Sequence, residues 1–138
     1  MRLAVVSDIH GNLEALEAVL LEIDRLSVDG VVALGDIVGY GPDPLACIYR
    51  IREAEASCVL GNHDAALVDA RFSHELNPIA RDTLLRSREM VTDEELAYLR
   101  TFAFRHVEAD GVFTHANPIV PEQWQHLHLF EHIKWCLE

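Results

Sequence analysis

Apolar runs alternate with amphipathic segments along the first half of the chain. Apolar residues dominate 2–7, 31–34 and 57–60, as is typical of strands buried on both faces of a parallel sheet. Between these runs, leucine and isoleucine recur at helical spacing over 13–23, and a second helix is expected over 44–56. This β-α-β-α-β order predicts an α/β fold with a mostly parallel sheet.

The second half is mainly helical in pattern. Helices are expected over 65–70, from Asn77 onward and after a capping box that begins at Thr92. Two further apolar runs, 102–108 and 112–116, joined through Asp110-Gly111, predict a hairpin or two adjacent strands.

The last segment, 121–138, has the pattern of one amphipathic helix. No linker is evident, and 138 residues leave room for one hydrophobic core and little more. A single domain over 1–138 is therefore expected.

Composition narrows the class of protein. No apolar run approaches the roughly 20 residues that cross a bilayer, and the N-terminus lacks the parts of a signal peptide, which predicts a cytoplasmic protein with no membrane contact. The net charge of −12, from 23 acidic and 11 basic residues, makes nucleic acid an unlikely partner. Cys47, Cys58 and Cys136 are an odd, scattered set and are expected to be reduced packing residues.

Residues that bind metals follow four of the apolar runs. Asp8 and His10 stand two apart, where strand alternation would place both side chains on one side. Asp36 follows the second run, and a carboxylate can bridge two cations. The turn 62–64 reads Asn-His-Asp, and His115 ends a later run. The carboxyl ends of parallel strands meet at one sheet edge, so these side chains are expected to share one site.

Each of these residues also has a purely structural interpretation. Asp8 and Asn62 suit helix caps, and Asp36 suits a turn. His10 and His63 suit surface positions, and His115 suits a merely structural residue at a strand end. The repetition at four strand ends favours a metal site. The other histidines are expected to be solvated or partly buried without a function: His74, His106, His126, His128 and His132.

The ordered motifs resemble the calcineurin-like metallophosphoesterase superfamily, and its small bacterial phosphodiesterase branch in particular. They are Asp8-Ile9-His10, Gly35-Asp36, Gly61-Asn62-His63-Asp64 and His115. The resemblance implies hydrolysis of phosphodiesters or phosphomonoesters by a metal-bound hydroxide at a site with two divalent ions, with manganese expected first and iron, zinc or nickel as alternatives.

The resemblance also implies a role for each residue. Asp8 and His10 would hold the first ion, Asp36 would bridge, and Asn62 and His115 would hold the second. His63 would protonate the leaving oxygen or steady the phosphoryl group, and Asp64 would orient His63.

One family motif is missing, because no Gly-His-x-His follows His115 before Glu138. The chain is therefore expected to be the front half of a four-layer α-β-β-α sandwich, truncated before that motif, with two weakened or incomplete metal sites and reduced activity. The less favoured alternative is that His126 and His128, from the same chain or from a second subunit, replace the missing ligands. An exposed half-fold predicts a homodimer or a strand-exchanged oligomer.

Two other functions stay open. One is a non-catalytic descendant that binds a metal or a nucleotide and acts through assembly, and the other is an inert α/β domain.

Overall fold

The computed structural model describes residues 1–108 and 111–137. Strands β1 (Leu3–Val6), β2 (Gly30–Ala33) and β3 (Ser57–Cys58) form a parallel sheet in the order β1-β2-β3. Strand β1 pairs with β2 from Leu3–Gly30 to Val6–Ala33, and β2 pairs with β3 through Val32–Ser57 and Ala33–Cys58. The parallel sheet predicted from the sequence is confirmed.

Helices α1 (Leu13–Leu26) and α2 (Pro44–Glu53) connect these strands, as predicted. Helix α1 begins after Asn12, whose side chain accepts a hydrogen bond from the Ala15 N–H. Helix α2 begins with proline at its first position, where the missing N–H has no intrahelical partner to lose.

The four helical segments directly after β3 are α3 (Asn62–Val68), the 3-10 helix η1 (Ala70–Glu75), α4 (Pro78–Met90) and α5 (Asp93–Leu99). Helix α3 begins three residues earlier than predicted, so the Asn-His-Asp turn forms its first turn. The helix start predicted at Asn77 is confirmed, since its side chain accepts from the Ala80 N–H, and the predicted capping box forms between Thr92 and Glu95.

The predicted hairpin is present but shorter than expected. Strands β4 (His106–Glu108) and β5 (Gly111–Phe113) are antiparallel. The run was predicted to begin at Phe102, but this side chain is buried in the core against Tyr98, and Ala103 forms an isolated parallel bridge with Val59 instead. Asp110, in the predicted connection, lies outside the described residues.

The single helix predicted over 121–138 is wrong. Within the described residues, only the 3-10 turn η2 (Pro121–Gln123) and α6 (Phe130–Leu137) are helical there. Trp124 has a left-handed backbone and donates its Nε1–H to the Leu60 carbonyl at 3.0 Å. This tertiary contact at the end of β3 overrides the helical periodicity.

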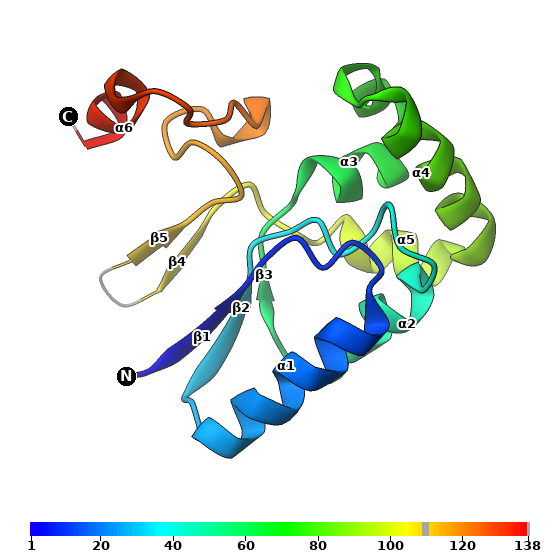
Figure 1. Cartoon of the computed structure of the whole chain (residues 1–138), viewed down its shortest axis with the longest axis horizontal. Coiled ribbons are helices and arrows are strands. Elements are labelled where there is room, and N and C mark those ends of the chain that lie inside the picture. Colours follow the sequence, from blue (N-terminus) through cyan, green and yellow to red (C-terminus); the bar gives the residue numbers. More distant parts are fainter. Residues whose placement is uncertain (109–110, 138) are drawn as a thin grey trace.

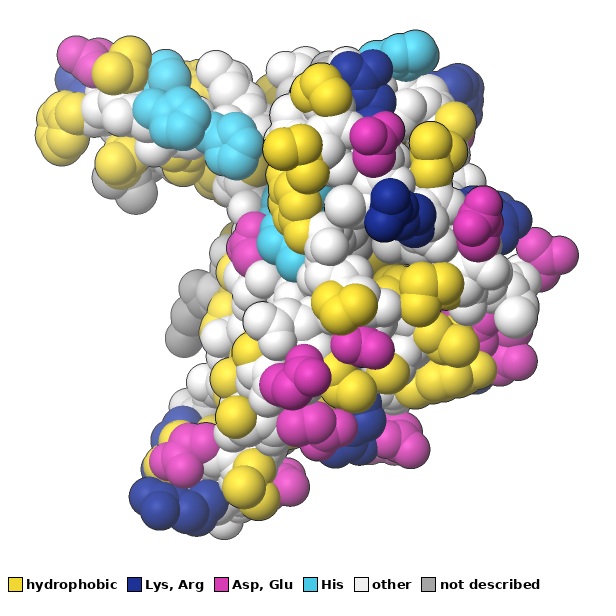
Figure 2. Space-filling model, turned by 45° about the vertical axis from the view of Figure 1, so that its right-hand side comes forward, with side chains coloured by type: hydrophobic (Ala, Val, Ile, Leu, Met, Phe, Trp, Pro, Cys, Tyr) yellow, Lys and Arg dark blue, Asp and Glu magenta, His cyan; other side chains and the backbone are white. Residues whose placement is uncertain are grey.

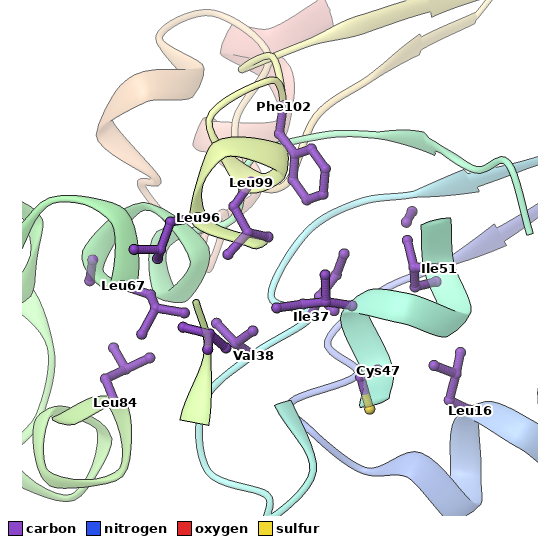
Figure 3. Packing of buried hydrophobic residues seen from close by; sticks show 14 of the residues in the cluster. Leu16, Ile37, Val38, Cys47, Ile51, Leu67, Leu84, Leu96, Leu99 and Phe102 are labelled. Atoms are coloured by element: carbon purple, nitrogen blue, oxygen red, sulfur yellow. The ribbon is translucent and has the colours of Figure 1, made fainter. Parts of the chain in front are cut away.

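Helices α1 to α5 lie on one side of the sheet, and the β4–β5 hairpin with α6 lies on the other (Figure 1). The core includes Ile37 and Val38, which directly follow Asp36 and pack in one cluster with Ile51, Leu96 and Leu99 (Figure 3). The loop that carries Asp36 is therefore anchored in the core.

The expectation about the cysteines is confirmed. The three cysteines are free thiols. No helix among the described residues is long and apolar enough to cross a membrane.

Candidate metal centre

The loops after β1 and β2 run side by side at the carboxyl end of the sheet. The Asp8 N–H donates to the Gly35 carbonyl at 3.1 Å, and the His10 N–H donates to the Asp36 carbonyl at 2.8 Å. Asp8, His10 and Asp36 all adopt left-handed backbone, with φ of 55°, 50° and 55°. Such strain at non-glycine residues gathers at functional sites.

This geometry corrects the argument from strand alternation. Strand β1 ends at Val6, so Asp8 and His10 lie in a loop and not on a strand. They still come together, because Nε2 of His10 lies 3.7 Å from Oδ1 of Asp8.

Asp64 ties the ends of β2 and β3 together. Its fully buried carboxylate accepts four backbone N–H groups, from Asp36 at 2.7 Å, Ile37 at 2.9 Å, Val38 at 3.3 Å and Gly61 at 3.2 Å. The prediction that Asp64 orients the His63 ring is wrong, because its carboxylate binds the backbone N–H groups of the two loops instead.

Three imidazoles converge on one oxygen of Asp36. The Nε2 atoms of His115, His10 and His63 lie 3.5, 3.7 and 4.0 Å from Oδ2. Asp36 and His63 are buried, with 3% and 4% of their surface exposed, whereas Asp8 lies on the open side with 59% of its side chain exposed.

The structure brings all the predicted ligand residues to this point. Oδ1 of Asn62 lies 3.1 Å from Nε2 of His115. Among the described residues, two groups of three have ligand atoms within 4.8 Å of one another: His10, Asp36 and His63, and Asp8, Asp36 and His115. Asp36 belongs to both groups, as a bridging carboxylate would.

Hydrogen bonds to the backbone fix which ring nitrogen faces the site. Nδ1 of His10 lies 3.0 Å from the Val38 carbonyl, and Nδ1 of His115 lies 2.8 Å from the Leu34 carbonyl. A carbonyl only accepts, so each Nδ1 carries the proton and each neutral ring turns the lone pair of Nε2 toward Asp36.

This arrangement of acceptors fits a divalent metal. Lone pairs of two imidazoles face a carboxylate oxygen at 3.5 and 3.7 Å, which is repulsive unless a cation or proton lies between them. Mixed imidazole, carboxylate and amide ligands suit manganese, iron or zinc. Nδ1 of His63 is also buried without a hydrogen-bond partner among the described residues.

The pKa shifts at this site also indicate that the buried carboxylates lack a compensating positive charge. Burial raises the pKa of Asp36 to about 8, and the nearby Asp64 carboxylate adds to this effect. Burial, together with the neighbouring His10 and His115, lowers the pKa of His63 to about 4. A divalent cation would compensate the buried carboxylates without adding a proton.

Sequence reasoning missed Tyr40. The centroid of its ring lies 4.8 Å from that of His10 and 4.9 Å from that of His63. The available signal was its place in the loop that carries Asp36, which does not distinguish it from the other loop residues.

The two histidines considered as substitute ligands lie in the segment 121–138, where the predicted single helix is absent from the described residues. His126 and His128 lie between η2 and α6, both exposed, with ring centroids 5.3 Å apart. Neither residue is in the two ligand groups found among the described residues.

Comparison with known proteins gives a consistent result. A family model described as calcineurin-like phosphoesterase matches residues 1–135. An uncharacterised protein of Methanocaldococcus jannaschii is 36% identical over 129 residues, which are 91% of this chain and 53% of that protein. A symmetrical bis(5'-nucleosyl)-tetraphosphatase of Chromohalobacter salexigens is 36% identical over 130 residues, which are 89% of this chain and 45% of that protein.

A solved structure shows the same fold. The metallophosphoesterase from Sphaerobacter thermophilus matches with a TM-score of 0.75 and 38% identity, over 92% of this chain and 51% of that one. The chain spans about half the length of these relatives.

Proposed function

Because the chain belongs to the calcineurin-like phosphoesterase family, we propose that it hydrolyses phosphodiesters or phosphomonoesters at a dinuclear metal centre around Asp36. The supporting observation is the convergence of three Nε2 atoms within 4.0 Å of Oδ2 of Asp36. When bound, divalent ions would polarise the phosphoryl oxygens and lower the pKa of a coordinated water.

The metal ligands in this proposal are Asp8, His10, Asp36, Asn62 and His115. Manganese is the first candidate, with iron, zinc or nickel as alternatives, because the ligands combine imidazole nitrogens with carboxylate and amide oxygens. Asp36 would be the bridging ligand, since it is the member shared by both groups of ligand atoms.

His63 would act on the phosphoryl group. With a pKa of about 4, its ring is neutral at neutral pH and holds no surplus proton to transfer. Of the two roles that the resemblance implied, this favours steadying a phosphoryl oxygen through a ring N–H. Asp64 is a positioning residue, because it holds the backbone of Asp36 and of Gly61.

The test is hydrolysis of bis-p-nitrophenyl phosphate with added Mn²⁺. Asp36→Asn should lower kcat/KM by about 100-fold or more, because it removes the shared carboxylate. Asp82→Asn on the exposed surface of α4 is the matched control and should leave the rate unchanged. A rate that Asp36→Asn does not alter contradicts the proposal, and metal binding without turnover supports the non-catalytic alternative.

We also infer that the chain self-associates. Val5 on the edge strand β1 is 49% exposed, and Val107 and Val112 on the hairpin are 63% and 56% exposed. Exposed apolar strands favour pairing with another chain. Size-exclusion chromatography with light scattering should show a dimer or larger species, and a monomer at working concentration contradicts this inference.

A further inference from the structure

The last turns of α3 line a cavity that is separate from the candidate metal centre. It measures about 370 Å³ and is formed by α3, the start of η1 and α4 (Figure 1). Its lining contains none of the residues that converge on Asp36. A volume of this size is in the range of small-molecule sites.

The floor of this cavity is apolar. Ala66 and Leu67 of α3 and Leu84 of α4 line it, and all three are buried members of the hydrophobic core. Figure 3 shows Leu67 and Leu84 on their two helices. Leu85 also lines the cavity but is 69% exposed. An alkyl group in the cavity would leave water and would cover Leu85, so this floor favours an apolar group.

The positive charge of this cavity comes from α4. Arg81, Leu84, Leu85 and Arg88 have the i, i+3, i+4, i+7 spacing that places side chains on one face of a helix. Each end of the leucine pair is therefore followed by an exposed arginine along α4. None of the described residues in the lining is acidic. The cavity thus combines an apolar floor with a cationic rim.

Arg81 is the arginine that is available for a ligand. Its guanidinium makes no hydrogen bond or ion pair with the residues that the structure describes. Arg88 already donates to the Val91 carbonyl at 3.3 Å and lies 3.7 Å from the Asp93 carboxylate. The Ser73 hydroxyl, also in the lining, donates to the Ala70 carbonyl at 2.7 Å. Arg81 therefore supplies the free donors, and a guanidinium binds a carboxylate bidentately.

A free arginine is an exception on this acidic chain. Figure 2 shows acidic side chains over much of the displayed surface, as expected for a net charge of −12. One free guanidinium neutralises the single charge of a carboxylate, whereas a phosphate dianion would keep surplus charge beside the apolar floor. The cavity is therefore matched to a monoanion with an apolar tail.

We propose that this cavity binds a small amphipathic carboxylate of the medium-chain fatty acid class. Arg81 binds the carboxylate, and the alkyl chain lies on the floor formed by Ala66, Leu67 and Leu84. This site goes beyond the proposed hydrolysis of phosphoesters, because its lining shares no residue with the metal ligands.

The experiment measures octanoate binding to the full chain by calorimetry. A chelator is present throughout, so that the carboxylate does not bind a metal ion instead. Octanoate should bind at one site per chain. Hexanoate should bind about fifteenfold more weakly, because each of the two missing methylene groups contributes about fourfold to the Kd. The uncharged 1-octanol should bind at least about tenfold more weakly than octanoate, because it lacks the ion pair.

Substitutions of Arg81 test the head-group contact. Arg81→Met should weaken octanoate binding at least about tenfold and leave 1-octanol binding unchanged. Arg81→Lys keeps the charge and should stay within about threefold of the wild type. Arg86→Met is the matched control, since Arg86 is also exposed on α4 but lines a different cavity with Tyr40. Its Kd for octanoate should equal that of the wild type.

Three outcomes overturn the proposal. One is the absence of octanoate binding, and another is wild-type affinity in Arg81→Met. The third is equal affinity for octanoate and 1-octanol, which would reduce the site to an apolar surface. If octanoate does not bind and Leu85→Gln turns an oligomer into a monomer in light scattering, the cavity is instead an interface between copies of the chain.

Discussion

A Cβ atom at position 39 would lie 2.3 Å from Nδ1 of His63. Gly39 also has a φ of 92°, which side chains rarely adopt. Both the backbone and the ring of His63 therefore require glycine here. The resemblance to phosphoesterases does not by itself explain this residue, whereas the contact does.

Gly39→Ala should displace the His63 ring and slow hydrolysis of the reporter. It should also destabilise the chain by about 1–3 kcal/mol, because a side chain is forced into a left-handed backbone. Urea unfolding and kcat/KM measure the two effects. Gly30→Ala is the control, since its Cβ meets only the flexible Cδ2 of Leu3 at 3.1 Å. Equal rates for Gly39→Ala and the wild type would contradict this account of His63.

Asp64→Asn should destabilise the fold although it changes few atoms. An amide NH₂ would replace one carboxylate oxygen and leave its backbone N–H donors without an acceptor, at a cost of about 1–3 kcal/mol each. Urea unfolding measures the loss, and the exposed Asp82→Asn is again the control. If both variants unfold at the same urea concentration, the four hydrogen bonds of Asp64 do not stabilise the loops as described.

The sequence predicts the fold well where local pattern and tertiary structure agree. The strands and helices up to residue 60 follow directly from periodicity and caps. The gathering of Asp8, Asp36 and His115 could also be expected, because parallel strand ends share an edge.

Other features depend on contacts that the sequence does not reveal. The helix predicted over 121–138 is interrupted because Trp124 is bound to Leu60, 64 residues away. The left-handed turns at Asp8 and His10, and the partners of the Asp64 carboxylate, likewise depend on the pairing of two distant loops.

The stability of the metal-free protein should depend on pH in a defined window. In the folded chain Asp36 keeps its proton up to a pKa of about 8, whereas in the unfolded chain it loses the proton near its ordinary pKa of about 4. The contribution of Asp36 to the free energy of unfolding therefore falls as the pH rises from about 4 to 8. The lowered pKa of His63, about 4, has the opposite slope between about 4 and 6.5. The His63 effect opposes the Asp36 effect below about pH 6.5, so the decline in stability should be steepest from about pH 6.5 to 8.

Thermal unfolding with a chelator measures this decline. Added Mn²⁺ should abolish it, because a cation replaces the proton on Asp36, and metal affinity should rise over the same window. Asp36→Asn should show a smaller decline without metal, because only the buried Asp64 carboxyl, whose pKa is also raised by burial, then remains to lose its proton. A midpoint that is constant from pH 6.5 to 8 in the metal-free wild type would falsify this assignment.

Single histidine substitutions should distinguish the histidines that bind metal from those that do not. His10→Ala and His115→Ala should each weaken Mn²⁺ binding at least about tenfold, because each removes a ligand whose Nδ1 is fixed by a backbone carbonyl. His126→Ala is the matched control and should bind Mn²⁺ as the wild type does. A loss of affinity in His126→Ala would instead restore the substitute-ligand hypothesis.

The central claim is that the chain holds divalent cations on Asp36. Its most direct test is the metal content of the full chain after Mn²⁺ loading and gel filtration, measured by elemental analysis beside Asp36→Asn. The account predicts up to about two ions per wild-type chain and a large loss in the variant. A wild-type chain with no bound metal, or a variant that retains the full content, would contradict it.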